Sequence, residues 1–427
     1  MRKDWIECAL GEIFNITYGK GLPVKKLTDK GFPVFGANGV IGYYSEYKYK
    51  DEQVLISCRG AASGTINMSP KECFVTNNSL IVEIGERVSL NKKYLYFMLN
   101  GANRSKIVTG SAQPQVTINN AITLIIPIVP LPEQRAIVAK TEELFSSLDS
   151  GIADLKKAQD QLKIYRQAVL SSSFPNKKLV EISKVINDLT QGWSPKCLNQ
   201  NSTNNAEWAV IKTTAIQASD FVEYENKILP SSLLPRKQHE IKQGDILITR
   251  AGPRVRVGIC CLVKKTRPKL INCDKVYRIR LNTDLVVPEY FESCINSPEI
   301  LSKIEKMKSG SSDSGLNLTQ KVFLKLQIHL PSIQEQHKIV EEIERRLSVC
   351  DKVEESIVES LEKAKALRQS ILKKAFEGRL LNDQEVAACK SAPDYEPASV
   401  LLKRIKAEKA TGLKKATVSR KIIKEKN

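Results

Sequence analysis

Residues 133–174 read EQRAIVAKTEELFSSLDSGIADLKKAQDQLKIYRQAVLSSSF, and residues 335–376 read EQHKIVEEIERRLSVCDKVEESIVESLEKAKALRQSILKKAF. The two stretches align without a gap at a constant offset of 202 residues, from Glu133 with Glu335 to Phe174 with Phe376. Loops tolerate insertions, whereas a continuous element does not. The match therefore predicts one uninterrupted element that occurs twice in the chain.

The apolar residues of both stretches repeat at the spacing of a long helix. In the first copy, one seven-residue ladder is Thr141, Leu148, Leu155, Leu162 and Val169, and its partner ladder is Ile137, Leu144, Gly151, Ala158 and Tyr165. Together the two ladders form an apolar seam along the predicted helix. The second copy follows this spacing less strictly, with Ile339, Ile343, Leu347, Cys350, Ile357, Ala364, Leu367 and Ile371. Neither stretch contains proline. Each predicts a helix of about 40 residues, about 60 Å long.

Two apolar stripes in one chain are most simply covered by packing on each other as an antiparallel pair. Each helix could instead pack against its neighbouring globular domain, or against another chain. We favour the intramolecular pair, because one chain then buries both stripes.

The segments between the helices also echo each other. Residues 54–64 (VLISCRGAASG) resemble 246–258 (ILITRAGPRVRVG), and residues 10–13 (LGEI) resemble 179–182 (LVEI). We therefore expect a mixed α/β fold with pseudo-two-fold duplication, in which a coiled-coil-like spacer of two long antiparallel helices separates two globular α/β domains. The predicted division is 1–132 for domain 1, 133–174 for the first helix, 175–331 for domain 2, 332–378 for the second helix, and 379–427 for a basic C-terminal tail.

The positive charge is concentrated outside the helices. The 427 residues carry a net charge of +19. Basic residues outnumber acidic ones by 15 to 10 in 1–132, by 24 to 15 in 175–331 and by 12 to 6 after 378, whereas 133–174 has 6 of each and 332–378 has 9 against 10. Basic surfaces of this size favour a polyanion, because phosphate contacts release counterions. Charge alone does not distinguish DNA from RNA, from an acidic membrane, or from a surface kept basic for solubility.

Several protein classes are disfavoured by what the chain lacks. We expect no membrane span and no secretory signal, since no run of 18 apolar residues and no cleavage-site pattern occurs. The ten cysteines form no C-x-x-C and only three histidines are present, so we expect no metal site, and reduced, mostly buried thiols in the cytoplasm. No G-x-x-x-x-G-K-[ST] motif is present, nor a motif typical of an adenine methyltransferase, so we expect neither an ATP-driven motor nor a methyl-transfer site and predict no catalytic residue and no cofactor.

These features together resemble the specificity subunit of type I restriction–modification enzymes. The resemblance rests on LPEQ (131–134) with its echo IQEQ (333–336), on the RQ…L…F helix ends, and on the order of domain, helix, domain, helix. It also includes FPVFGANGVIG (32–42), GDILITRAG (244–252) and EPASVLLKRIKAEK (396–409). The basic residues beyond about 410 extend past the family's usual ending.

The resemblance implies a DNA-binding subunit without catalytic activity. Each of two target recognition domains would read one half of a bipartite double-stranded DNA site, and the helices would set the gap between the halves and dock two methyltransferase subunits. Restriction/translocase subunits would join the full complex, whose methyltransferase and nuclease activities lie outside this chain. The alternative is a basic coiled-coil scaffold that binds nucleic acid without sequence specificity.

Candidate base-reading residues are polar side chains on turns that follow strands. In domain 1 they are Asn38, Ser57, Arg59, Ser63 and Thr65, and in domain 2 they are Lys212, Thr213, Thr214, Thr249, Arg250, Arg254 and Arg256. Three arginines around Gly252-Pro253 predict a rigid basic loop, although they could also cluster by chance on a solvated face. The Gly-Ala-Asn-Gly sequence at 36–39 could equally be a tight turn with Asn38 in a left-handed conformation.

Overall fold

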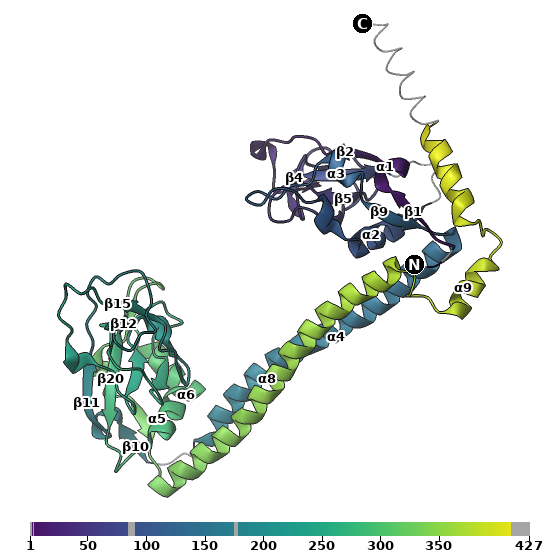
Figure 1. Ribbon diagram of the computed structural model, residues 1–427. Coiled ribbons are helices and arrows are strands. Elements are labelled where there is room, and N and C mark those ends of the chain that lie inside the picture. Colours follow the sequence, from purple (N-terminus) through teal and green to yellow (C-terminus); the bar gives the residue numbers. More distant parts are fainter. Residues whose placement is uncertain (1, 3, 84–89, 175–177, 411–427) are drawn as a thin grey trace. The chain divides into compact units, whose positions relative to one another are not determined.

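The computed structural model describes residues 2, 4–83, 90–174 and 178–410. The chain divides into two compact units. Unit 1 comprises Met1–Leu155 with Glu359–Asn427, and unit 2 comprises Lys156–Val358. Each unit contains one globular domain and a part of both long helices (Figure 1).

The domain of unit 1 combines two β-sheets with short helices. An antiparallel sheet has the order β2-β8-β5-β6, with β2 Asn15–Tyr18, β8 Ser79–Glu83, β5 Val54–Ser57 and β6 Ile66–Met68. A second sheet has the order β4-β3-β7, with β4 Val40–Tyr44, β3 Phe32–Phe35 and β7 Phe74–Val75, and β3 is parallel to β7. The remaining elements are β1 Ile6–Ala9 paired with β9 Ile125–Ile128, the helices α1 Leu10–Ile13, α2 Lys92–Gly101 and α3 Ile118–Ala121, and the 3₁₀ turns η1 Val24–Lys26 and η2 Arg104–Ile107.

The domain of unit 2 repeats this arrangement and adds short hairpins. Its four-stranded sheet has the order β11-β20-β16-β18, with β11 Ile186–Gln191, β20 Val276–Leu281, β16 Ile246–Thr249 and β18 Cys260–Leu262. Its three-stranded sheet has the order β15-β12-β19, with β15 Asn226–Ile228, β12 Ala209–Ile211 and β19 Leu270–Ile271, and β12 is parallel to β19. Three further pairs are β10 Leu179–Glu181 with β22 Gln327–His329, β13 Ile216–Gln217 with β14 Asp220–Phe221, and β17 Ala251–Gly252 with β21 Leu316–Asn317. The helices are α5 Pro288–Ile295, α6 Pro298–Met307 and α7 Gln320–Phe323, and the 3₁₀ turns are η3 Ile182–Lys184, η4 Thr213–Ala215 and η5 Lys237–His239.

The matching strand orders identify the two domains as copies of one mixed α/β plan. The echo between 54–64 and 246–258 falls on β5 and β16, which hold the same place in their sheets. The predicted match of LGEI with LVEI is wrong by three residues. Ala9 pairs with Ile125 as Glu181 pairs with Gln327, so Leu10 corresponds to Ile182. The pairing of β1 with β9 and of β10 with β22 defines this equivalence. The similarity between LGEI and LVEI is displaced from it by three residues.

The repeated stretches form the long helices α4 Leu131–Ser173 and α8 Ile333–Phe376. Within unit 1, Ile137 and Val138 of α4 share an apolar cluster with Leu372 and Ala375 of α8, and the Arg368 guanidinium lies 4.3 Å from the centroid of the Phe145 ring. Residues near the start of α4 therefore contact residues near the end of α8. The helices lie side by side as an antiparallel pair within the chain (Figure 1), and this intramolecular packing was the alternative we favoured.

Burial along the helices corrects the predicted seam. The ladder from Thr141 to Val169 faces inward, and a matching ladder on α8 is buried at Ile343, Cys350, Ile357, Ala364 and Ile371. The partner ladder is confirmed only in part: Ile137 is buried and Leu144 and Ala158 are half-buried, but Gly151 is exposed and Tyr165 is 48% exposed. Leu367 of α8 is likewise 50% exposed. Phe145, Ile152, Gln159 and Arg166 are half-buried as well, although they were not predicted. The buried face of α4 therefore includes positions on both the i+3 and the i+4 sides of the leucine ladder.

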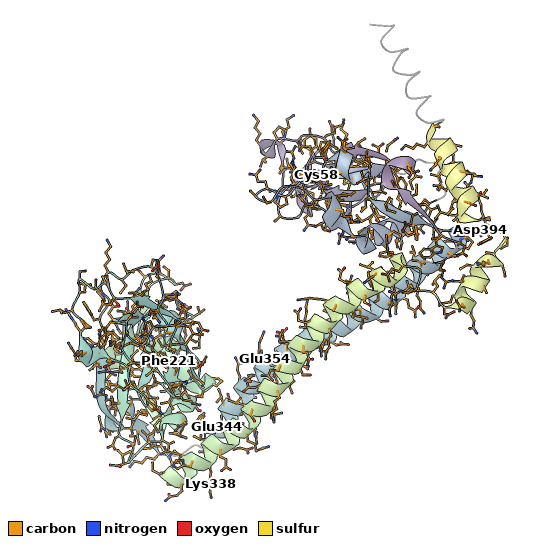
Figure 2. All side chains as sticks on the ribbon, in the orientation of Figure 1. Cys58, Phe221, Lys338, Glu344, Glu354 and Asp394 are labelled. Carbon is orange, nitrogen blue, oxygen red and sulfur yellow. The ribbon has the colours of Figure 1, made fainter. Side chains whose placement is uncertain are left out.

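Two ion pairs between the helices repeat the internal symmetry. In unit 2, Arg166 Nη2 lies 2.7 Å from an Asp351 carboxylate oxygen and 2.9 Å from one of Glu354, a residue of α8 (Figure 2). In unit 1, Arg368 pairs with Asp149. Adding 202 to Arg166 and to Asp149 gives Arg368 and Asp351, so the identical residues of the repeat make reciprocal contacts.

The segment from 379, grouped above as a basic tail, is folded onto unit 1 as far as residue 410. It contains α9 Asp383–Lys390 and a helix from 398 to 410, the last described residue of this segment. Leu401 and Ile405 are fully buried in the core of domain 1. Arg135 donates two hydrogen bonds, of 2.8 and 2.9 Å, to the Asp394 carboxylate. Residues 411–427, which carry the basic extension, lie outside the described residues.

The ten cysteines are free thiols, and nine of them are buried. Among the described residues, no group of histidine, cysteine and carboxylate side chains is placed to hold a metal ion. Across the same part of the chain, no helix is long and apolar enough to cross a membrane.

A buried carboxylate on α5 gives unit 2 a pH-dependent stability. Glu292 is 3% exposed and accepts a hydrogen bond of 2.6 Å from the backbone N–H of Leu262 in the edge strand β18. Burial raises its pKa from 4.5 to about 7. Between these two pH values the folded state holds a proton that the unfolded state releases. The contribution of Glu292 to the stability of unit 2 is therefore greatest below pH 4.5 and is lost as the pH rises to about 7.

We expect the free energy of unfolding of unit 2 to fall by about 3 kcal/mol between pH 4.5 and 7.5 because of this group. Glu292→Gln keeps an oxygen acceptor for Leu262 without the charge, and should remove this part of the pH dependence. Urea titrations of both proteins at several pH values, followed by tryptophan fluorescence, measure the difference. Parallel pH profiles for the two proteins would show that Glu292 does not titrate in this range.

Candidate DNA-recognition site

The first candidate, Asn38, lies at the tip of the hairpin between β3 and β4. Its side chain is exposed. The turn is closed by a hydrogen bond of 2.8 Å from the Gly36 N–H to the Gly39 carbonyl. Gly39 takes the positive φ, at 135°, whereas Asn38 does not. The sequence is thus a tight turn, and it presents the Asn38 amide to solvent without holding that residue in a left-handed conformation.

Ser57 supports this hairpin instead of facing outward. It is fully buried at the end of β5. Its hydroxyl donates to the Ala37 carbonyl and accepts a hydrogen bond of 3.0 Å from the Asn67 side-chain amide. The serine therefore fixes the turn that carries Asn38.

Arg59, Ser63 and Thr65 follow β5 on one loop. Arg59 is exposed, and the Ser63 hydroxyl donates a hydrogen bond of 2.7 Å to the Pro114 carbonyl. Ser63 and Thr65 line an open hollow of about 350 Å³ together with Arg104. The structure thus brings Ser63 and Thr65, but not Arg59, together beside the basic side chain of Arg104.

Arg104 was not singled out from the sequence. It donates a hydrogen bond of 3.3 Å to the Gly64 carbonyl, and burial lowers its pKa. Asn103 begins the short turn η2 by accepting a hydrogen bond from the Ser105 N–H, which directs Arg104 into the hollow. An asparagine cap before an arginine was the available signal, but it is a weak one.

In domain 2, Lys212 and Thr214 share one carboxylate. The Thr214 hydroxyl donates a hydrogen bond of 2.6 Å to Glu225, and the Lys212 ammonium lies 3.4 Å from the same oxygen. The hydrogen bond from Thr214 is the main reason that the pKa of Glu225 is lowered. Lys212 is half-buried and Thr214 is exposed, so the pair is partly accessible.

The predicted basic loop is held together by its arginines. Arg256 donates hydrogen bonds of 2.6 and 2.7 Å to the carbonyls of Thr213 and Ile216, which ties the loop to η4. Arg250 donates a hydrogen bond of 2.9 Å to the Asp274 carbonyl and lies over the Tyr277 ring, 5.6 Å from its centroid. These two guanidinium groups brace the loop from inside the domain.

The remaining loop residues differ in exposure. Thr249, which corresponds to Ser57, is fully buried. Arg254 is exposed but pairs with two carboxylates, Glu305 and, at 2.9 Å, Asp313. Its hydrogen bond to Asp313 is the main reason that its pKa is raised. A phosphate or base would have to replace these carboxylates to bind Arg254.

An apolar and basic surface around β4 was also missed. Val40 and Ile41 are 49% and 50% exposed, and Val24 in η1 is 78% exposed next to Lys25 and Lys26. The Thr28 N–H donates to the Tyr43 carbonyl at 2.9 Å, which holds the η1 loop against β4. Each of these residues is unremarkable in the sequence, because only the hairpin brings them together.

Comparison with known proteins places the chain in a family. The model of the type I restriction modification DNA specificity domain matches residues 2–163 and 176–363. The chain belongs to the type I DNA specificity family. Each of the two matched segments of this family contains one globular domain and a large part of the helix that follows it.

Relatives in the specificity family match nearly the whole chain or a part of it. The type I restriction enzyme EcoKI specificity subunit of Escherichia coli K12 is 27% identical over 451 aligned residues, covering 95% of each chain. The EcoEI specificity subunit of Escherichia coli is 42% identical over 172 residues, which are 40% of this chain and 29% of that relative.

Two solved structures have a similar fold. The HsdS subunit of Thermoanaerobacter tengcongensis has a TM-score of 0.52 at 18% identity and covers 89% of this chain and 98% of its own. A chain from work on complex assembly and conformational transition of the type I R-M system has a TM-score of 0.65 at 20% identity and covers 89% and 99%. At these identities, the likeness shows the fold that this specificity-family chain shares with them.

Proposed function

We propose that this chain is a non-catalytic specificity subunit that reads a bipartite DNA sequence and directs a partner adenine methyltransferase and restriction endonuclease to it. The observation that carries the proposal is the duplication: two domains of one topology, each followed by a helix of the same repeat. Membership of the type I specificity family supports it. The methyltransferase, nuclease and ATPase activities would lie in other subunits.

Each domain would read its own half-site. The two domains have sheets of the same strand order but differ in the side chains that these sheets expose. Domain 1 exposes Val40 and Ile41 on β4, whereas in domain 2 Asn226 on the matching strand β15 is buried. Different surfaces on one frame suit a target whose halves differ in sequence.

The bases and phosphates would meet the exposed members of the candidate set. In domain 1 we propose Asn38 and Arg59, with Arg104 in the adjacent hollow as a phosphate contact. In domain 2 we propose Lys212, Thr214 and Arg254. Ser57, Thr249, Arg250 and Arg256 would act indirectly, because their polar groups hold the loops in shape.

The helices would separate the domains as a coiled-coil-like spacer and dock two methyltransferase subunits. Support comes from exposed residues that are identical at the 202-residue offset: Glu142 with Glu344, Ser146 with Ser348, Lys163 with Lys365 and Gln167 with Gln369. On α4 these positions fall within about 100° of the helix circumference, at 3.6 residues per turn. A surface that occurs twice suits one partner bound twice. Restriction/translocase subunits would complete the complex in the cytoplasm.

Co-expression with a type I methyltransferase subunit tests the proposal directly. We expect the two proteins to purify as a complex, and adenine methylation to appear on genomic DNA at one split motif only when both are present. The chain without its partner should give no methylation. A complex that binds DNA without any methylated motif would instead support a scaffold that binds nucleic acid nonspecifically.

A further inference from the structure

The repeated glutamine of the LPEQ and IQEQ motifs joins each long helix to its globular domain. Gln134, in the first turn of α4, is fully buried. Its side-chain oxygen accepts a hydrogen bond of 3.0 Å from the Asn91 N–H, and its side-chain nitrogen donates one of 2.9 Å to the Val129 carbonyl. Asn91 is the N-cap of α2, so Gln134 links the start of a domain helix to the start of the long helix.

Gln336 makes the same connections in unit 2. It is fully buried, and its oxygen accepts a hydrogen bond of 2.8 Å from the Val287 N–H, at the N-cap of α5. Its nitrogen donates bonds of 3.0 Å to the carbonyls of Pro331 and Leu285. Pro331 lies 202 residues after Val129, so the two glutamines donate to equivalent carbonyls of the repeat. We call each set of these glutamine hydrogen bonds, between a long helix and its domain, a joint.

A tyrosine on the same domain helix completes each joint. The Tyr94 hydroxyl of α2 donates a hydrogen bond of 2.8 Å to the Pro127 carbonyl in β9, and the Tyr290 hydroxyl of α5 donates one of 2.8 Å to the His329 carbonyl in β22. Pro127 and His329 again differ by 202. The same domain helix is thus fastened both to the strand that leads into the long helix and to that helix itself.

The chemistry of the joint requires a carboxamide. A helix N-terminus leaves backbone N–H groups without intrahelical partners, and a buried one must find an acceptor. Glutamine supplies that acceptor and a donor on one planar group, so it bridges an N–H and a carbonyl in a fixed geometry. Methionine has a similar length but offers neither bond.

We propose that Gln134 and Gln336 are positioning residues that fix the direction of each recognition domain on its helix. This inference rests on the proposed function, in which the two domains must engage both halves of one DNA site together. The residues touch no DNA in this scheme. They determine how strongly the protein prefers the natural gap between the half-sites over a gap one base pair longer or shorter.

The test uses the complex with the methyltransferase and duplexes that carry the methylated motif with its natural gap, or with a gap one base pair longer or shorter. We expect Gln134→Met and Gln336→Met each to lower the affinity ratio between natural and altered gaps by about fivefold, since each loses a buried hydrogen-bonded bridge. A general loss of stability would lower the active fraction but leave this ratio unchanged. Gln161→Met with Gln334→Met is the matched control, because those glutamines are exposed on the same two helices and lie outside the repeated surface proposed to dock the methyltransferase.

Each outcome decides one point. Wild-type ratios in both joint variants would overturn the inference. A wild-type complex that does not distinguish the gaps would count against the proposed function itself. Hydrogen exchange on the wild-type complex provides a second test that needs no variant: the Asn91 and Val287 amides should be strongly protected, and rapid exchange at both would also overturn the inference.

Discussion

A chain ending at residue 377 is expected to lose the fold of domain 1. The removed segment buries Leu381, Leu401 and Ile405 to 6% exposure or less, and Leu401 and Ile405 belong to the core of that domain. A buried side chain of this size contributes about 1.5–3 kcal/mol, so the truncation should lower the free energy of unfolding by roughly 5 kcal/mol or more. That is comparable with the whole stability of an ordinary domain.

Ion pairs contribute less to this effect than burial does. The segment also carries Lys390, which pairs with Asp4, and Asp394, which pairs with Arg135, but these pairs are largely exposed. Exposed pairs contribute about 0–1 kcal/mol each. Charge-removing substitutions at Lys390 and Asp394 should therefore cost much less than the deletion.

Limited proteolysis and thermal unfolding of chains ending at 377 and at 410 provide the measurement. We expect rapid cleavage within domain 1 of the shorter chain, while domain 2 resists, because its core contains none of the removed residues. The chain ending at 410 is the control, since it retains every described contact. Equal stability of the two truncated chains would show that the segment only lies against the domain without stabilising it.

The helices were predictable because their signal is long and local. The ungapped match at an offset of 202 residues, the apolar spacing and the absence of proline predicted both helices to within two residues of their observed ends. The second ladder was predictable only in part, because which residues are covered depends on the side of α4 on which α8 packs: Gly151 is exposed whereas Ile152 is half-buried. That side is decided by contacts such as Arg166 with Asp351, between residues far apart in the chain.

The candidate site was predictable only as a set of loops. Arg254 and Arg256 look alike in the sequence, yet Arg254 pairs with carboxylates at the surface whereas Arg256 donates hydrogen bonds to the carbonyls of Thr213 in η4 and Ile216 in β13. Their partners come from residues about 40 to 60 positions away, which no local pattern indicates. The fold of the C-terminal segment was likewise not predicted, since the segment is basic in composition and its buried leucines and isoleucine, Leu381, Leu401 and Ile405, are few.

A shortened helix pair should change the gap between the half-sites without changing either half-sequence. The chain passes from domain 1 through α4 into domain 2, so the length of the pair enters the distance that the protein can span. Removing seven residues from each helix shortens the pair by about 10 Å, or about three base pairs of DNA. The seam is preserved, because its ladders repeat every seven residues.

The residues to remove are chosen so that the ion pairs between α4 and α8 are kept. Deleting 153–159 from α4 together with 353–359 from α8 leaves Asp149, Arg166, Asp351 and Arg368 in place, so both reciprocal pairs can re-form. Deleting 153–159 alone displaces Arg166 by seven residues from its partner on α8. We therefore expect the single deletion to damage the pair, and the double deletion to retain it.

Mapping adenine methylation in cells that express the double deletion with the methyltransferase subunit measures the result. The original motif should lose methylation by about 100-fold or more, since engaging only one half-site forfeits several base contacts worth about 1–3 kcal/mol each. Any new motif should keep both half-sequences, with a gap shorter by about one to three base pairs, because DNA twist as well as length restricts which gaps fit. Altered half-sequences with an unchanged gap would contradict the proposed roles. The helices would then determine which bases are read, and the domains would determine the distance between the half-sites.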